Sequence, residues 1–268
     1  MKLWIDGVLK DVDRARIAPN DRGFLLADGL FETMRAVDGK VQFFHAHYRR
    51  LCEGIKVLGF YTEWTEDLLD EACRDLLAAN DLVDASLRLT VTRGTGPRGL
   101  LPPHDVAPTI MLTAFGMTHE PHTLPAASLT VSDIRRNEGS PLSRIKALGY
   151  LDNIMALSAA RDAGFDDAVM LNNAGRVCSA TAANIFAMTG QRLVTPPLED
   201  GVLGGITRAR LLKAAAGQGY DVVEESLGVE QLKSADSLYL TNSLIGIRLV
   251  ASLDGQGFDT AACPIQLD

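Results

Sequence analysis

Patterns typical of short strands alternate with patterns typical of helices along the whole chain, and this alternation limits the possible folds more than any other feature. In the first half, the sequence predicts strands at residues 2–6, 85–94 and 108–116, and a strand hairpin at 30–44 that turns at Asp38-Gly39. Helices are predicted at 45–60 and 65–81, and Thr65 is the expected N-cap of the second.

The alternation resumes after residues 116–128, an aperiodic segment with proline and histidine that is the best candidate for a linker. Strands are then predicted at 128–135, 167–173, 184–189, 192–196 and 237–242, helices at 150–163 and 207–217, and a short helix between residues 227 and 236. The mixture predicts an α/β (α+β) fold. We expect a small N-terminal α/β domain at residues 1–120, a larger C-terminal domain at 121–268, and a cleft between them.

Composition narrows the possible classes of protein. The chain has 268 residues, 47% of them hydrophobic, as in folded globular proteins. Lys and Arg number 26 against 34 Asp and Glu, and the resulting net charge of −8 argues against nucleic acid or an anionic membrane as the main partner. No run approaches the roughly 18 apolar residues of a membrane span. The N-terminus lacks the apolar core of a signal peptide, so we expect a cytoplasmic protein.

The cysteines and histidines give no metal signal. The four cysteines form no CxxC pair and the five histidines are scattered, so no zinc spacing is present. We therefore expect reduced thiols in the protein core and no metal site.

One lysine stands out, because Lys146 lies inside the mostly apolar stretch PLSRIKALGYLDNI. One interpretation is a side chain whose stem is covered while its ammonium group reaches water. The other is a lysine held in a pocket, where its amine can condense with a carbonyl group.

A second candidate is GVLGGITRARLL, a glycine-rich turn that leads into a helix with Ile206 and Thr207 in its first turn. Free amide groups at a helix start, together with a hydroxyl, can bind an anion. The stretch matches neither the Walker A nor the GxGxxG pattern, and a plain capped loop is the alternative. Arg50, in HYRRL, could pair with a phosphate through its planar guanidinium, although a helix arginine is commonly solvated.

Taken together, these motifs resemble those of the fold-type IV pyridoxal-phosphate enzymes. DRGFLLADGLFET, HYRRL, RIKALGYLDN, AANIF, GVLGGITR and LTNSLIGIRLV follow one another in the order and spacing of that family, over nearly the whole chain. The resemblance implies a two-domain fold like that of D-amino acid aminotransferase, with pyridoxal 5'-phosphate in the cleft between the domains. It also implies a homodimer that acts on a small-molecule amine.

The resemblance assigns roles to individual residues. Lys146 matches the Schiff-base lysine, which also moves the proton once the substrate displaces it. The matches to cofactor-binding positions are Arg50, Ile206, Thr207 and Ser243 at the phosphate, Leu203 on the pyridine ring and Tyr150 near the phenolate oxygen. Phe31, Glu32, Arg98 and Asn242 match positions on the substrate side.

Ser179 departs from the family pattern. Members usually place a glutamate against the pyridine nitrogen, and in GRVCSATAANIF that position is Ser179. A carboxylate would favour a protonated nitrogen, whereas a serine can only hydrogen-bond a neutral one, so the ring should withdraw electrons less strongly. We hypothesise that this change suits an elimination with an aromatic product better than it suits transamination.

Two stretches favour one branch of the family. TRGTGPRGLLPP and LTNSLIGIRLV are similar to the corresponding segments of aminodeoxychorismate lyases. D-amino acid aminotransferases use a tyrosine and a histidine beside an arginine to bind the substrate carboxylate; here Phe31 and Leu100 replace the first two and Arg98 remains. Arg98 could equally be an ordinary arginine of a surface loop.

The leading hypothesis is therefore a lyase that converts 4-amino-4-deoxychorismate to p-aminobenzoate and pyruvate, a step of folate precursor synthesis. The alternative enzyme is a class IV aminotransferase acting on D- or branched-chain amino acids with a 2-oxo acid acceptor. A pyridoxal-phosphate-binding protein without activity is the third possibility, and only Ser179 supports it. The sequence alone leaves open the physiological substrate, the stereochemical preference and the oligomeric state.

Overall fold

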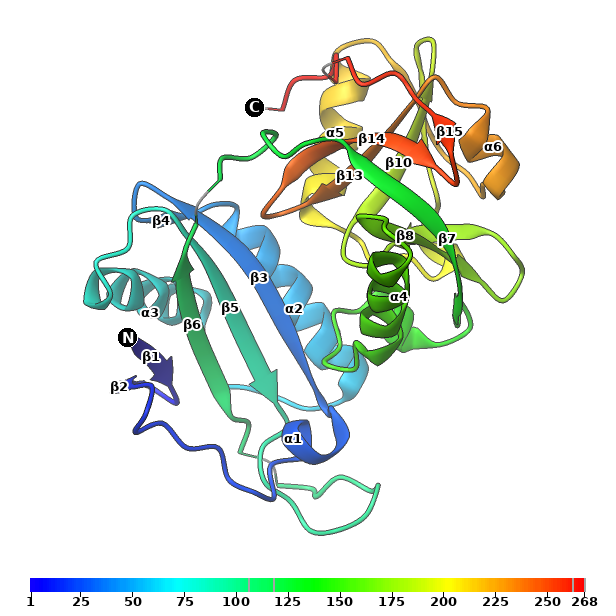
Figure 1. The fold of residues 1–268 in the computed structure, drawn as a ribbon. Coiled ribbons are helices and arrows are strands. Elements are labelled where there is room, and N and C mark those ends of the chain that lie inside the picture. Colours follow the sequence, from blue (N-terminus) through cyan, green and yellow to red (C-terminus); the bar gives the residue numbers. More distant parts are fainter. Residues whose placement is uncertain (106, 118, 262, 268) are drawn as a thin grey trace. The chain divides into compact units, whose positions relative to one another are not determined.

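The computed structural model describes residues 1–105, 107–117, 119–261 and 263–267 (Figure 1). The chain forms two compact units. The first contains Met1–Thr118 and the short segment Ile145–Gly149, and the second contains His119–Arg144 and Tyr150–Asp268. The segment with Lys146 thus packs with the first unit, although the chain on both sides of it belongs to the second.

The first unit is built on an antiparallel six-stranded sheet. Its strands, in spatial order, are β2 (Val8–Asp11), β1 (Lys2–Ile5), β6 (Ile110–Gly116), β5 (Ala85–Thr92), β3 (Gly29–Val37) and β4 (Lys40–Val41). Helices α2 (Phe44–Leu58) and α3 (Glu66–Ala79) cover one face of this sheet (Figure 1). Leucines of both helices pack there against Leu30 and Met34 of β3. A third, short helix, α1 (Arg22–Leu26), precedes β3.

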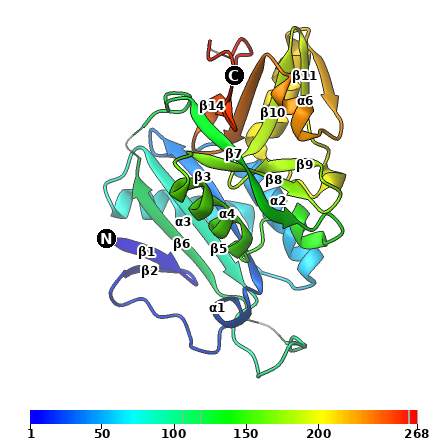
Figure 2. The ribbon, with the colours of Figure 1, turned by 45° about the vertical axis from the view of Figure 1, so that its right-hand side comes forward.

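The second unit contains a mixed nine-stranded sheet. Its order is β12 (Asp221–Glu224), β11 (Arg192–Thr195), β10 (Asn184–Thr189), β13 (Ser237–Asn242), β14 (Gly246–Leu253), β7 (Ala127–Arg136), β8 (Asp167–Asn172) and β9 (Val177–Ala180), and β15 (Gln256–Gly257) pairs with β14. The parallel strands β7 and β8 run side by side (Figure 2). The helices of this unit are α4 (Leu151–Asp162), α5 (Ile206–Gly217) and α6 (Val229–Lys233), with 3-10 turns at Pro141–Arg144 and Leu198–Asp200.

Strand β10 separates two hydrophobic cores of the second unit. Ile185 packs with Leu232 of α6 on one face, and Phe186 packs with Leu211 of α5 on the other. Because successive side chains of a strand point to opposite faces, a strand buried on both sides is apolar throughout. This explains the continuous apolar run of NIFAMT.

The mixed architecture with two sheets confirms the predicted fold class, and every predicted helix and strand is present. The N-cap prediction is confirmed as well, since the Thr65 hydroxyl accepts a hydrogen bond from the Leu68 amide at 3.4 Å. The sequence analysis did not predict β2, α1, β9, β12, β14 or β15. These elements are short or depend on distant pairing, as when β14 joins β13 to β7, so their local sequence carries little signal.

Candidate functional site

Lys146 lies against the first strand residues of β3. Phe31 donates its backbone N–H to the Lys146 carbonyl at 2.9 Å, and Leu148 donates to the Gly29 carbonyl at 3.0 Å. Between these bonds, Leu30 and Ala147 form an antiparallel bridge. The backbone of the lysine is therefore fixed as if it belonged to an added strand.

The side chain of Lys146 is half-buried and packs on an aromatic ring. Its Nζ lies 4.2 Å from the centre of the Phe31 ring, and the guanidinium carbon of Arg88 lies 3.8 Å from the same centre. Cations are attracted to the face of an aromatic ring at such distances. The ammonium group is thus held against the Phe31 ring, and a second cation lies beside the same ring.

Arg88 is a candidate that the sequence analysis missed. In the β3–β5 pair, Arg88 lies opposite Thr33, which shares a face of the sheet with Phe31. Its neighbours Leu87 and Leu89 belong to the helix-covered core, so Arg88 faces the other way. The available signal in the sequence was the alternation Leu87-Arg88-Leu89, which is typical of a strand with one polar face. Only the pairing with β3 brings Arg88 beside Phe31.

Glu32 and Arg50 form a pair on the opposite, helix-covered face of this sheet. Arg50 donates from Nε to Glu32 Oε1 at 2.8 Å and from a terminal nitrogen to Oε2 at 2.5 Å. His47 Nδ1 lies 2.7 Å from the same Oε2. The structure thus places Glu32 and Phe31, two predicted substrate residues, on opposite faces of β3.

The charge of Glu32 is strongly stabilised. Burial raises the pKa of this carboxyl, but the hydrogen bonds from Arg50 and His47 outweigh burial, so the pKa lies below its ordinary value. Glu32 is 1% exposed and remains an anion at neutral pH. It can therefore orient the Arg50 guanidinium.

In the second unit, the start of α5 fits a phosphate group. Gly205 is the N-cap residue and no side chain caps the helix, while Thr207 in the first turn is buried. Asn184 donates to the Leu203 carbonyl at 2.9 Å and holds the approach to the helix. A Cβ at Gly205 would lie 2.0 Å from Asn184 Oδ1, so this close approach requires glycine. Uncapped amides at the start of a twelve-residue helix favour an anion.

Asn242 and Ser243 form a tight turn beside this approach. Asn242 Oδ1 accepts hydrogen bonds from the Leu244 and Ile245 amides at 2.9 Å each, and its Nδ2 donates to the Ala182 carbonyl at 3.1 Å. The predicted substrate residue Asn242 is thus engaged in building the turn that carries Ser243. The strand pair Asn184–Thr241 places this turn near Asn184.

Ser179 and Tyr150 are also in the second unit. Ser179 lies on β9 opposite Met170 of β8 and is 9% exposed. The adjacent strand β8 contains no glutamate that could replace the one usual at position 179. Its one carboxylate belongs to Asp167, whose Oδ1 accepts a hydrogen bond from the Thr181 hydroxyl at 2.6 Å. Tyr150 lies at the N-cap position of α4 and is half-buried.

Arg98, the remaining predicted substrate residue, is exposed in the loop that follows β5. The described part of the chain contains no group of three or more side chains suited to a metal ion. Within the same residues, no helix is long and apolar enough to cross a membrane.

Comparison with known proteins agrees with these features. Residues 29–253 match the family model described as amino-transferase class IV. The chain is 36% identical to the Methanocaldococcus jannaschii protein named "Putative branched-chain-amino-acid aminotransferase", over 96% of this chain and 89% of that protein. It is 30% identical to aminodeoxychorismate lyase of Bacillus subtilis, over 91% of this chain and 84% of that enzyme.

The fold is also similar to solved structures. The branched-chain aminotransferase of Thermoproteus uzoniensis superposes with a TM-score of 0.90 at 29% identity, covering 97% of this chain and 90% of that one. The predicted fold, that of the fold-type IV enzymes, is thereby confirmed.

Proposed function

The chain belongs to the class IV aminotransferase family, whose members use pyridoxal phosphate, and we propose that it is a lyase that forms p-aminobenzoate and pyruvate from 4-amino-4-deoxychorismate. The observation that carries the proposal is the position of Arg88 beside Phe31 and Lys146. Aminodeoxychorismate carries two carboxylates, and arginine binds carboxylates well. A branched-chain amino acid would instead need an apolar surface there for its side chain.

Ser179 supports the same assignment. Without a carboxylate at this position, the ring nitrogen of the cofactor stays neutral and the ring withdraws electrons less strongly. An elimination whose product is aromatic depends less on that withdrawal, because aromaticity itself favours the product. Similarity to the Bacillus subtilis lyase over most of both chains is a second support.

When bound, pyridoxal phosphate supplies an aldehyde carbon for amines and an electron-withdrawing ring. Lys146 Nζ would be the amine of this chain that holds the cofactor, and the same nitrogen would accept the ring proton of the substrate. The start of α5, with Ile206, Thr207 and the nearby Ser243, would hold the phosphate, and Leu203 would pack on the ring. Arg50, oriented by Glu32, would add positive charge for the phosphate.

The second candidate is an aminotransferase with a 2-oxo acid acceptor. It is favoured by the 36% identity to the Methanocaldococcus jannaschii protein, which exceeds the 30% identity to the lyase. As an aminotransferase, the chain would use Lys146, Arg50 and the start of α5 to bind the cofactor in the roles given above. Arg88 would then bind the acidic side chain of an amino acid or a 2-oxo dicarboxylate.

The test measures p-aminobenzoate release by the cofactor-loaded protein given aminodeoxychorismate, with the visible band of the cofactor recorded in the same sample. We expect release by the wild type and by Lys56→Ala, an exposed lysine of α2, and none by Lys146→Ala. If Lys146→Ala abolishes the cofactor band but the wild type releases no p-aminobenzoate, the lyase assignment is contradicted. Turnover of an amino acid with 2-oxoglutarate by that same wild type would then establish the aminotransferase.

We further propose that the protein is a homodimer. The α4 helix exposes Leu151, Ile154 and Met155, which are spaced to share one helix face. Such a stripe favours a protein partner over water. Light scattering coupled to size exclusion should give twice the monomer mass of 28.9 kDa, and a monomer at micromolar concentration would contradict the proposal.

A further inference from the structure

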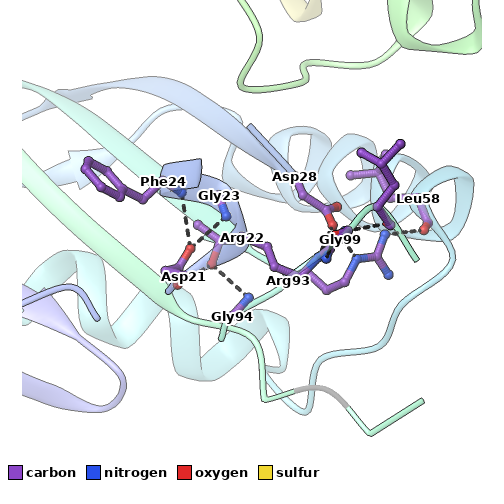
Figure 3. Close-up of polar contacts among 11 residues, drawn as sticks. Asp21, Arg22, Gly23, Phe24, Asp28, Leu58, Arg93, Gly94 and Gly99 are labelled. Atoms are coloured by element: carbon purple, nitrogen blue, oxygen red, sulfur yellow. Dashed lines mark hydrogen bonds and ion pairs between the residues drawn. The ribbon is translucent and has the colours of Figure 1, made fainter. Parts of the chain in front are cut away.

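One buried arginine, Arg22, forms hydrogen bonds to the loop that follows β5. We define the Arg98 loop as Thr95–Pro103; its residues Leu100 and Leu101 are 84% and 85% exposed. Arg22, on α1, donates from its two terminal nitrogens to the carbonyls of Gly99 and Leu100, at 3.1 Å and 2.9 Å. Figure 3 shows Arg22 near the start of α1, together with Gly99 of this loop. The two carbonyls belong to the residues directly after Arg98.

The stem of Arg22 also lies against the loop. A Cβ at Gly96 would be 3.0 Å from Arg22 Cδ, so only glycine leaves the stem its full room. Arg22 is 4% exposed, and its backbone N–H donates to the Gly94 carbonyl at 2.8 Å. The side chain therefore contacts the loop on both sides of Arg98.

Asp28 fixes the direction of the Arg22 guanidinium. Asp28 Oδ2 accepts from Arg22 Nε and from Arg93 Nε, each at 2.8 Å (Figure 3). Burial raises the pKa of the Asp28 carboxyl, but the hydrogen bonds from Arg93 and Arg22 outweigh burial and lower it overall. Arg93 points elsewhere and donates to the Leu58 carbonyl at the end of α2, at 2.8 Å. Only one of the two arginines thus reaches the Arg98 loop.

The attachment of α1 keeps the Arg22 backbone in place. Asp21 is fully buried and caps α1 by accepting from the Gly23 amide at 2.8 Å. Its other oxygen accepts from the hydroxyls of Thr92 and Thr109, both at 2.9 Å. The base of the arginine is therefore bound to strand β5 and to the residue before β6.

We propose that Arg22 is a positioning residue, which fixes the peptide after Arg98 so that Arg98 meets the substrate carboxylate. This proposal rests on the proposed function and on the role that the family resemblance implies for Arg98, which is to bind a substrate carboxylate. Holding two successive carbonyls and a carboxylate at once requires the planar, forked guanidinium. The start of the loop is held by backbone contacts, since Gly96 donates to the Asn20 carbonyl at 3.3 Å. At the exposed residues Gly99 and Leu100 the Arg22 bonds fix a backbone that would otherwise be mobile.

The experiment compares Arg22→Ala with Arg93→Ala, because each removes one guanidinium from the same Asp28 oxygen. We expect Arg22→Ala to raise KM for aminodeoxychorismate by about tenfold with kcat changed by less than about twofold, which is loss of binding without loss of chemistry. Arg93→Ala should leave KM within about twofold of wild type. The double variant Arg22→Ala/Arg98→Ala should have the KM of Arg98→Ala alone, because Arg22 acts through Arg98.

Amide hydrogen exchange of the Arg98 loop is measured on the same cofactor-loaded variants. We expect faster exchange at residues 98–101 in Arg22→Ala and no change there in Arg93→Ala. Equal KM values in the two single variants, additive effects in the double variant, or unchanged loop exchange would each overturn the proposal. Should Arg22→Ala fail to fold, Arg22→Lys keeps the charge and the stem but lacks the fork that reaches both carbonyls, and a rise in KM and in exchange is again expected.

Amide hydrogen exchange can be measured without turnover. A failure of this inference can therefore be distinguished from a failure of the proposed function. A wild type that releases no p-aminobenzoate contradicts the lyase, and KM is then measured for the amino acid that the protein transaminates. Faster loop exchange with unchanged KM for the substrate that is turned over would refute the positioning role of Arg22 and leave the enzyme assignment intact.

Discussion

Replacing Glu32 by Gln tests whether the buried pair with Arg50 stabilises the first unit. The substitution keeps the shape of the side chain and removes its charge. Arg50, whose side chain is 13% exposed, then loses its anionic partner and keeps one oxygen acceptor in place of two, and His47 loses its anionic partner as well. Breaking a buried ion pair by removing one partner costs about 3–5 kcal/mol, because the remaining charge is left uncompensated. At about 2–4 °C per kcal/mol, the melting temperature should fall by roughly 6–20 °C.

The two tryptophans of the chain make this measurement specific. Trp4 and Trp64 both belong to the first unit and pack edge to face, with ring centres 5.1 Å apart. Urea unfolding of the cofactor-free protein, followed by tryptophan fluorescence, therefore reports on the unit that contains Glu32. The matched control is Glu53→Gln on the same helix as Arg50, since Glu53 and Arg49 are both 68% exposed and 3.9 Å apart. Such an exposed pair contributes less than about 1 kcal/mol.

The pH dependence gives an independent check. Because the pKa of Glu32 is lower in the folded state, its stabilisation is complete above the ordinary glutamate pKa of about 4.3 and is lost as the pH falls through the folded value. The gap in unfolding free energy between wild type and Glu32→Gln should thus be full at pH 7 and close in acid. A gap no larger than that of Glu53→Gln, or one that does not change with pH, would refute the reasoning.

Three further outcomes are expected. Ser179→Glu should raise aminotransferase side activity relative to p-aminobenzoate release, measured by product ratio, because a carboxylate favours a protonated ring nitrogen; an unchanged ratio contradicts this. Gly205→Ala should weaken pyridoxal phosphate binding by about tenfold or more in a fluorescence titration, since its Cβ would lie 2.0 Å from Asn184 Oδ1; wild-type affinity would show that the helix start is not the phosphate site. Asp28→Asn should lower stability at pH 7, and this loss should shrink as the pH falls below the ordinary aspartate pKa of about 3.9, because the pKa of Asp28 is lowered by its arginines in the folded state; a loss that does not change with pH would exclude an electrostatic cause.

The sequence alone determined the local features of this protein. The periods of apolar residues predict the helices and strands, and Thr65 marks a helix start because its hydroxyl satisfies a free amide there. The glycine-rich turn before Ile206 was also evident, because glycines before a helix are needed wherever backbone amides must stay accessible. These features depend on neighbours within a few residues, and such information is contained in the sequence itself.

The tertiary structure decided which of these residues meet. Phe31 and Glu32 are consecutive, yet one contacts Lys146 and the other pairs with Arg50, because adjacent strand residues point to opposite faces and only the packed helices determine which face is covered. Arg88 reaches Phe31 through strand register, and Arg22 holds a carbonyl 77 residues away. Strand register and long-range contacts depend on the folding of the whole chain, and for that reason no local sequence pattern predicts them.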